Sequence, residues 1–547
     1  MIVKHRAVNR RSVVIGLGAA AGAAAVGGIT LTAQAENTGG TDSAGTSADG
    51  SLVFDRDDFT KKTESIADAS GTEHSVTYRF YKARDYVTHP SDSGHQSLVV
   101  SVPVTIDGKA VDASNAPIVL ANAVGAYMPS TVADATGVGQ AKLEMTGMGG
   151  GTGDPMPSGM PSGGTGGGMA GGTGAVNGMV NLAKLALVAG YVVVEPGTRG
   201  RSLTDSSGTY YGTAPAVIVD LKAAVRYLRA NKGRVPGNVE RIVSTGTSAG
   251  GASSALLGAS GDSEIYEPYL RQAGAADASD AIFATGAWCP ITDLEHADGA
   301  YEWNWGTLPT QSTGKTVDQN VSKELRSQFA EYQASLNLRG LKGSRFGKIT
   351  ARNYADYLLE HYLRPSATKY LAALPASERE TYLAENTFIT WQNDRAVFTW
   401  EGYLAHVARR KKTQPAFDAF DLSAGENNEF GEGTTKARHF TAYSARNDTT
   451  GLSGKRVDSD IPEKLKLMNP MFHLLEERNP HRSRHWWIRL GTSDTDTALT
   501  VAANLAMAVD NLGDEVDHAY YWDKGHATNE DPGDFFKWVA EVTGHKS

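Results

Sequence analysis

Two nearly continuous apolar runs, Pro117–Leu120 and Tyr191–Val194, constrain the fold of this chain more than any other feature. Strands that are apolar at every position are buried on both faces, as in a largely parallel sheet covered by helices. The segment Pro215–Asn231 predicts such a helix, because it starts with Pro and repeats apolar residues at helical spacing. Further short strands are expected at Val76–Tyr81 and Leu98–Val102. Strands that alternate with helices in this way predict an α/β fold.

Length and composition exclude several classes of protein. The 547 residues allow two to four domains, or one large core that carries an insertion. With 52 Lys and Arg against 61 Asp and Glu, the net charge of -9 disfavours nucleic-acid binding, which requires a basic surface. The single Cys289 cannot form an intramolecular disulfide, and it excludes a zinc or iron–sulfur site built on cysteines.

The first 35 residues have the pattern of an export signal. Arg10 and Arg11 directly precede an apolar, Ala- and Gly-rich run over residues 13–26, and Ala-Gln-Ala at residues 33–35 is typical of a cleavage site. This pattern predicts a twin-arginine signal peptide over residues 1–35, recognised by the twin-arginine export machinery. The apolar run is too short for a permanent membrane anchor. We therefore expect a secreted, extracellular protein.

Two further segments have compositions that disfavour a packed structure. Residues 36–50 are mostly Thr, Gly, Ser, Asp and Ala, which predicts a flexible linker. Residues 147–174 are rich in Gly, Met, Pro and Ser, and they predict a disordered insertion. A methionine loop that binds a metal or another ligand is the alternative interpretation of this insertion.

A Gly-x-Ser-x-Gly motif connects a strand to a helix. The strand that starts at Arg241 runs into Gly246-Thr247-Ser248-Ala249-Gly250, and a helix of small residues follows over Ala252–Leu257. This is the context of a nucleophile elbow, a strained turn that exposes a serine hydroxyl above the sheet. Glycines are required on both sides of the serine because side chains there would clash. The motif predicts that Ser248 is a nucleophile.

A serine nucleophile requires a base and an acid, which in this fold follow the serine in the order acid, then histidine. Asp494 and Asp496 follow the expected strand Trp486–Leu490, and His526 follows a later one. Loops at the carboxyl ends of parallel strands build the sites of such sheets. One of the two aspartates is also expected to cap the helix Thr497–Leu512.

Several segments resemble bacterial tannases, the tannin acyl hydrolases: Gly190–Arg201, Ala214–Asn231, Gly246–Ala252, Ile291–Trp303, Pro415–Asp418, Glu426–Gly431 and Lys436–Thr441. The resemblance extends from about Leu52 to the C-terminus. It implies an α/β-hydrolase core with a mostly parallel sheet, made of residues 51–307 and 470–547. A mainly helical lid over residues 308–469 is implied between the two parts of the core.

The resemblance also implies roles for six side chains: Ser248, Asp494 and His526 as a catalytic triad, and Lys412, Glu426 and Asp496 as the groups that hold galloyl hydroxyls. Three adjacent phenolic hydroxyls donate hydrogen bonds to carboxylates and accept them from an ammonium group, so one Lys with two carboxylates suits them. Without the resemblance, Arg409–Lys412 would be interpreted as a solvated helix face, and Glu426 as a loop carboxylate.

The oxyanion hole is expected to combine two backbone N–H groups. One belongs to Ala249, and the other to Gly125 or Ala126 in the loop after the strand Pro117–Leu120. Tannases tend to have a Gly-Gly pair where this chain has Gly125-Ala126. Alanine is tolerated there unless the backbone requires a positive φ.

The expected function is hydrolysis of galloyl esters, both hydrolysable tannins and simple gallates, through an acyl-enzyme that releases gallic acid. The expected partner is a small galloyl ester or gallotannin, and neither a metal nor a cofactor is expected. Two alternatives stay open at this point. The first is a feruloyl or general aryl esterase, which differs only in the ring substituents of its substrate, and the second is a non-catalytic binding protein with a hydrolase fold.

Overall fold

The computed structural model describes residues 52–145 and 180–545 of the chain. The predicted signal peptide (1–35), linker (36–50) and Gly/Met-rich insertion (147–174) lie outside the described residues. None of the described helices is both long and apolar enough to cross a membrane.

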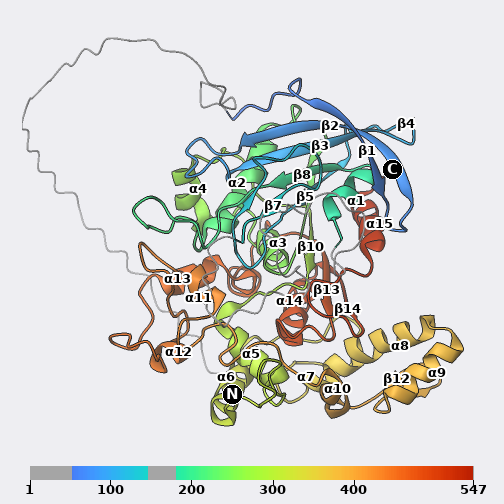
Figure 1. Cartoon of the computed structure of the whole chain (residues 1–547), viewed down its shortest axis with the longest axis vertical. Coiled ribbons are helices and arrows are strands. Elements are labelled where there is room, and N and C mark those ends of the chain that lie inside the picture. Colours follow the sequence, from blue (N-terminus) through green and yellow to red (C-terminus); the bar gives the residue numbers. More distant parts are fainter. Residues whose placement is uncertain (1–51, 146–179, 546–547) are drawn as a thin grey trace, which may run out of the picture. The chain divides into compact units, whose positions relative to one another are not determined.

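The described residues contain a ten-stranded sheet with the order β1-β2-β3-β8-β5-β9-β10-β13-β14, in which β4 pairs with β3 off this path (Figure 1). Its strands are β1 (Thr60–Ala67), β2 (Glu73–Asp85), β3 (Ser97–Ile106), β4 (Lys109–Ala110), β5 (Pro117–Ala121), β8 (Val192–Pro196), β9 (Asn238–Thr247), β10 (Ala284–Trp288), β13 (His485–Gly491) and β14 (Glu515–Tyr521). Two small two-stranded sheets consist of β6 (Ser130–Thr131) with β7 (Lys142–Leu143), and of β11 (Thr390–Gln392) with β12 (Arg395–Val397).

Strands β8, β5, β9, β10, β13 and β14 are parallel, whereas β1, β2 and β3 pair antiparallel at one edge. The predicted α/β fold with a largely parallel sheet is therefore confirmed. The strands expected at Val76–Tyr81 and Leu98–Val102 lie in its antiparallel part.

Helices cover both faces of the sheet, as the apolar strands require. Alternate residues of β5 face opposite cores, because Ile118 and Leu120 pack in one core and Val119 in the other. The first core contains residues of α2 (Ala216–Ala230), α3 (Ala249–Ala259) and α14 (Leu499–Asn511), and the second contains residues of α1 (Leu182–Val188) and α15 (Pro532–Thr543). The 3₁₀ turn η1 (Glu264–Tyr266) and α4 (Glu267–Ala273) precede β10.

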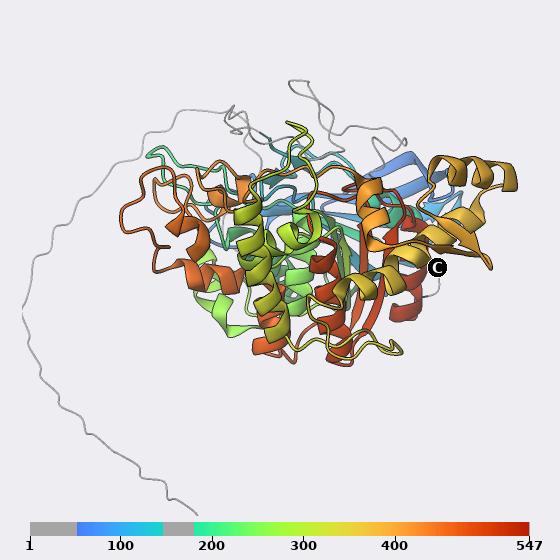
Figure 2. The same ribbon diagram turned by 90° about the horizontal axis from the view of Figure 1, so that it is seen from below.

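A mainly helical insertion separates β10 from β13 (Figures 1 and 2). Besides β11 and β12 it contains α5 (Leu294–Trp305), α6 (Gln319–Ser335), α7 (Tyr354–Leu358), the π-helical turn η2 (Leu359–Leu363), α8 (Arg364–Ala373), α9 (Ala376–Glu385), α10 (Trp400–Val407), α11 (Gly425–Glu429), α12 (Ala442–Arg446), α13 (Ile461–Leu467) and the π-helical turn η3 (Phe472–Glu476). The predicted lid, residues 308–469, lies within this segment.

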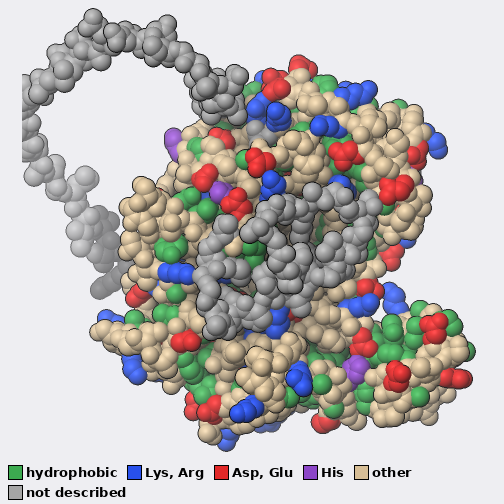
Figure 3. All heavy atoms as spheres, viewed as in Figure 1, with side chains coloured by type: hydrophobic (Ala, Val, Ile, Leu, Met, Phe, Trp, Pro, Cys, Tyr) green, Lys and Arg blue, Asp and Glu red, His purple; other side chains and the backbone are tan. Residues whose placement is uncertain are grey.

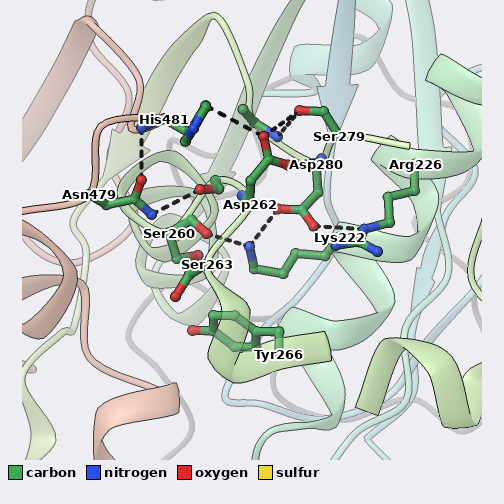
Figure 4. A network of polar contacts seen from close by, with 12 residues as sticks. Lys222, Arg226, Ser260, Asp262, Ser263, Tyr266, Ser279, Asp280, Asn479 and His481 are labelled. Carbon is green, nitrogen blue, oxygen red and sulfur yellow. Dashed lines mark hydrogen bonds and ion pairs between the residues drawn. The ribbon is translucent and has the colours of Figure 1, made fainter. Parts of the chain in front are cut away.

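A buried ionic network anchors the far end of α3 (Figure 4). The Lys222 ammonium of α2 donates to the carbonyl of Ser260, which ends α3, and to the Asp280 carboxylate, at 2.6 and 2.7 Å. Arg226 binds the same carboxylate at 2.8 Å. Burial lowers the pKa of Lys222, and the Asp280 charge offsets part of this effect. The helix that begins at the predicted nucleophile is thereby fixed at its other end.

The distribution of charged side chains on the surface is consistent with the modest net charge of the sequence. In Figure 3, acidic and basic side chains are interspersed over the described part of the visible face. This distribution differs from the concentrated basic surface of nucleic-acid-binding proteins.

Candidate active site

Ser248 occupies a strained turn between β9 and α3. Its φ and ψ are 61° and -124°, which a residue with a side chain rarely adopts. Its N–H donates to the Trp288 carbonyl at the end of the adjacent strand β10, at 2.9 Å. The elbow geometry expected from Gly-x-Ser-x-Gly is therefore present, with a bond to the neighbouring strand that holds it.

The two glycines of the motif are required by close approaches. A Cβ at Gly246 would lie 2.5 Å from the Asn122 side chain and from the Gly250 carbonyl. A Cβ at Gly250 would lie 2.6 Å from the Asn122 side chain and 2.7 Å from the Val124 carbonyl. The Asn122 amide also donates to the carbonyl of Thr245 at 3.1 Å. The glycines thus allow the loop after β5 to pack directly against the serine turn.

His526 and Asp494 lie beside Ser248. The His526 Nε2 is 2.7 Å from the Ser248 Oγ, and its Nδ1 is 2.8 Å from the Asp494 Oδ2. The side chains of His526 and Asp494 are almost completely buried, with exposed fractions of 1% and 0%. Each residue follows the carboxyl end of its own strand: β9, β13 or β14. The structure therefore brings together the three side chains predicted as a triad.

A tight turn follows β5 at the predicted oxyanion loop. The Met128 N–H donates to the Gly125 carbonyl at 2.9 Å, and the two residues between them, Ala126 and Tyr127, have φ values of 50° and 54°. The buried Arg201 holds both of these residues, because its Nε donates to the Ala126 carbonyl and its N–H to the Tyr127 carbonyl, at 2.8 and 2.9 Å. Arg201 thus compensates for the strain of a turn that has no glycine at its two central positions.

Two adjacent lysines bind the two carboxylates predicted to hold galloyl hydroxyls. The Lys412 Nζ is 3.0 Å from the Glu426 Oε1, and the Lys411 Nζ is 2.7 Å from the Asp496 Oδ1. The Asp496 N–H donates to the Asp494 carboxylate at 3.0 Å, which connects this cluster to the predicted triad. The structure therefore brings together Lys412, Glu426 and Asp496, and it adds Lys411.

The buried Tyr301 of α5 joins the lysine and aspartate segments. Its hydroxyl donates to the Thr495 carbonyl at 2.6 Å and accepts from the Lys412 N–H at 3.0 Å. The spacing between the ammonium groups and Asp496 is therefore set by a helix of the insertion.

Asp298 of the same helix positions the segment on the other side of Lys412. Its carboxylate accepts from the N–H groups of Phe417 and Asp418 at 2.7 and 3.1 Å. Burial and the Asp418 charge raise the pKa of Asp298 to about 7. The centroid of the Phe417 ring lies 3.7 Å from the Lys412 Nζ, so the π face of the ring contributes to the attraction that holds the ammonium group.

Solved structures of known enzymes resemble the whole described fold. A tannase from Fusobacterium nucleatum is 33% identical with a TM-score of 0.72, and the match covers 90% of this chain and 100% of that one. A tannin acyl hydrolase from Lactobacillus plantarum is 32% identical with a TM-score of 0.71, over 90% of this chain and 98% of that one. The chain belongs to the tannase family. It is therefore a carboxylic ester hydrolase with an α/β-hydrolase fold and a lid, as predicted.

Other comparisons add further information about this chain. The BD-FAE family model matches residues 165–332. A comparison with curated proteins found no match. A further solved tannin acyl hydrolase, 32% identical over 90% of this chain and 98% of that one with a TM-score of 0.71, is in complex with ethyl gallate.

Nearby charges shift the pKa values of His526 and Asp496 in opposite directions. Burial lowers the pKa of His526, but the Asp494 charge and other nearby negative charges outweigh it and raise the pKa well above 6.5. Burial would raise the pKa of Asp496, but the positive charges of His526 and Lys411 lower it below its usual value. The His526 imidazole therefore lies near Asp496, whose lowered pKa favours its ionised form at neutral pH.

One group of described residues has donors spaced for a metal ion. The Cys289 sulfur, an Asp494 oxygen and a His526 nitrogen all lie within 4.8 Å of one another. Both nitrogens of His526 are already hydrogen-bonded to Asp494 and Ser248. A metal bound to this group would therefore displace the His526 imidazole from one of these two hydrogen bonds.

One expectation from the sequence was wrong at this site, and one alternative interpretation is not found. Neither Asp494 nor Asp496 caps the helix that follows, because α14 starts at Leu499, whose N–H donates to Asn304 of α5 at 2.9 Å. The alternative interpretation of Arg409–Lys412 as a solvated helix face, which the resemblance to tannases argued against, does not apply: the segment follows the end of α10, and Lys411 is buried. Both differences arise because α5 and the segment after α10 pack on the site.

Sequence reasoning did not assign Lys411 or Tyr301 to the site. Lys411 was part of a basic run, which gives no indication of its partner in the core. Tyr301 lies in a segment that resembles tannases, and this resemblance was the available signal.

Proposed function

We propose that this tannase hydrolyses galloyl esters by two-step acyl transfer. His526 removes the Ser248 proton while Asp494 orients the imidazole, and the Ser248 oxygen attacks the galloyl carbonyl. His526 then protonates the leaving alcohol. Water, activated by the same imidazole, releases gallic acid from the acyl-enzyme. The observation that carries this proposal is the chain of hydrogen bonds from Ser248 through His526 to Asp494, at 2.7 and 2.8 Å.

Backbone amides in the two strained turns supply the proposed oxyanion hole. Ala249 opens α3, and the first N–H groups of a helix have no partner within the helix. The turn at Gly125 and Ala126 packs against the same serine loop through Asn122. These donors are held before the reaction starts, so little reorganisation accompanies formation of the oxyanion.

The cluster of Lys412, Glu426 and Asp496 supports a galloyl ring as the acyl group. Three adjacent hydroxyls both donate and accept, and a mixed set of one ammonium and two carboxylate groups can satisfy them together. The charge of Lys412 acts on Asp496, which also binds the loop of Asp494. The proposed ring-binding groups are therefore close to the reacting atoms.

A parallel assay of three esters tests this function. We expect methyl gallate to be hydrolysed with a higher kcat/KM than methyl ferulate, and with a kcat/KM higher than that for methyl benzoate by about 10⁴-fold, because an analogue without hydroxyls leaves buried polar groups unpaired. The measurement is HPLC quantification of the released acids. A preference for ferulate would indicate a feruloyl esterase, and similar rates on all three would indicate a general aryl esterase. Absence of turnover on every ester would favour a binding protein.

We expect kcat/KM to fall when the pH decreases below the pKa of His526, which lies above 6.5. Only neutral His526 accepts the serine proton, and Asp494 raises the pKa of His526 well above 6.5. Below this pKa, kcat/KM should fall about tenfold per pH unit. The measurement is kcat/KM for methyl gallate from about pH 5 to about pH 8.5. As a control, the residual activity of Asp494→Asn should decline at a lower pH, because the carboxylate charge is gone. A rate that stays constant over this range would contradict the role of His526.

We also propose that the enzyme is exported by the twin-arginine pathway and acts outside the cell. This rests on Arg10, Arg11 and the apolar run that follows. Export of folded protein by this route suits a large chain that requires no disulfide.

A further inference from the structure

The carboxylate of Asp523 is bound by the lid, although it belongs to the loop of His526. Asp523 lies three residues before His526, directly after β14. Its Oδ1 is 2.5 Å from the Nε2 of His406, the penultimate residue of α10. Its Oδ2 accepts a hydrogen bond from the hydroxyl of Tyr382 on α9. Two separate helices of the insertion therefore converge on one side chain of this loop.

The neighbouring residue Trp522 strengthens this connection. Its indole N–H donates to the Tyr382 hydroxyl at 2.8 Å. The His406 ring lies parallel to the indole, with 3° between the planes and 5.7 Å between the centroids. Trp522 is 3% exposed, and the side chains of His406 and Asp523 are 19% and 27% exposed, so the contacts around the loop are partly to fully buried.

The loop itself has a conformation that requires external support. Asp523 and Ala527, on either side of His526, have φ values of 56° and 65°. Residues with side chains stay in this region only when their surroundings hold them there. The Asp523 N–H donates to the Thr492 hydroxyl at 2.9 Å, which joins this loop to the one that carries Asp494.

The lid contacts the Asp494 loop as well. The hydroxyl of Tyr403, one turn before His406 on α10, donates to the carbonyl of Thr492. Tyr403 is fully buried. One face of α10 therefore contacts both loops. It contacts Thr492, two residues before Asp494, and Asp523, three residues before His526.

We propose that Asp523 is a positioning residue, through which His406 and Tyr382 of the lid place the His526 imidazole between Ser248 and Asp494. This inference rests on the proposed triad. It gives the lid a role in proton transfer in addition to any contact with substrate. Because His526 acts on every ester, the role is independent of the galloyl ring.

The central variant is Asp523→Ala, assayed on methyl gallate and p-nitrophenyl acetate. We expect kcat to fall about tenfold or more on both esters with little change in KM, because a small displacement of the imidazole slows proton transfer but leaves ring binding intact. The rate at which a fluorophosphonate labels Ser248 should fall in parallel. Asp523→Asn, which still accepts from Tyr382, should recover part of the loss.

The pH dependence separates positioning from general destabilisation. If the imidazole moves away from Asp494, the acid limb of kcat/KM should shift to lower pH in Asp523→Ala. His406→Ala should have a smaller effect, and the double variant should be no worse than Asp523→Ala, because both changes act through one contact. Arg345→Ala is the matched control: it breaks an ion pair with Glu360 on the exposed lid surface and should leave all these values unchanged.

Each outcome decides between the two proposals. If Asp523→Ala keeps the wild-type kcat, the wild-type labelling rate and the wild-type acid limb of the pH profile, the positioning role is wrong. The proposed function would still stand in that case, provided that Ser248→Ala is inactive. Wild-type activity in Ser248→Ala would overturn both. If Asp523→Ala fails to fold, Tyr382→Phe decides, because it removes one hydroxyl: unchanged kcat and labelling would overturn the role, and a parallel fall in both would support it.

Discussion

Replacing Ser248 by alanine is expected to lower kcat for methyl gallate at least about 10³-fold with little loss of stability. The substitution removes only the Oγ, which is hydrogen-bonded to His526. Alanine offers no group that could replace it as the nucleophile. His526→Ala and the double variant should be about as inactive as Ser248→Ala, because the residues of a triad act as a unit. The measurement is kcat on methyl gallate, with the thermal unfolding midpoint of each variant.

Ser253→Ala is the matched control for this experiment. Ser253 lies on the same helix, and its hydroxyl donates to the Ala249 carbonyl at 2.8 Å, within α3. Its removal should leave kcat within a few-fold of the wild type. More than a tenth of wild-type activity in Ser248→Ala would overturn the nucleophile assignment. Fully additive losses in the double variant would point to a base other than His526.

Loss of the Glu426 carboxylate is expected to reduce kcat/KM for methyl gallate by about 10²-fold or more. Glu426 would accept from galloyl hydroxyls, and its removal leaves the Lys412 ammonium without its partner at 3.0 Å. Asp496→Ala should have a comparable effect on methyl gallate. Hydrolysis of p-nitrophenyl acetate by Glu426→Ala should change much less, because the acetyl group makes none of these contacts. The measurement is the ratio of the two kcat/KM values.

Glu432→Ala supplies the control for Glu426. Glu432 lies on the same segment, but its side chain is 59% exposed and binds Lys464, which has no role in the proposed ring-binding cluster. Its variant should keep the wild-type ratio of the two esters. If Glu426→Ala loses both activities equally, the residue supports the fold or the triad, and the gallate-specific role is wrong.

Local patterns in the sequence predict part of the core of the fold. The apolar runs at β5 and β8 predicted buried strands because burial on both faces leaves no polar position. By contrast, β1 has the sequence TKKTESIA, and β10 is the short ATGAW. Neither has the apolar run or alternation from which strands are predicted. β1 is ordered by pairing with β2, the next strand in the chain, and β10 by pairing with β9 and β13, the second of which lies about two hundred residues later.

Some residues of the candidate site are predicted by a local motif, and others only by the resemblance to tannases. Ser248 follows from its motif alone, because the serine turn is a local structure. Lys412 and Glu426 came from the resemblance to tannases, since nothing in a basic run or a loop carboxylate specifies a partner. The contacts of Lys411 with Asp496 and of His406 with Asp523 join the lid to the core across 85 and 117 residues. No local pattern encodes such pairs.

The insertion between β10 and β13 has a consequence for folding. Ala284 pairs with His485, so about two hundred residues must be ordered or looped out before these neighbouring strands meet. Contacts of such long sequence separation form slowly, whereas β5, β8 and β9 connect through much shorter segments. We expect the serine half of the molecule to condense first and the strands that carry Asp494 and His526 to dock last. A newly made chain would then have an exposed serine turn but no proton acceptor, and would gain esterase activity only with its final folding step.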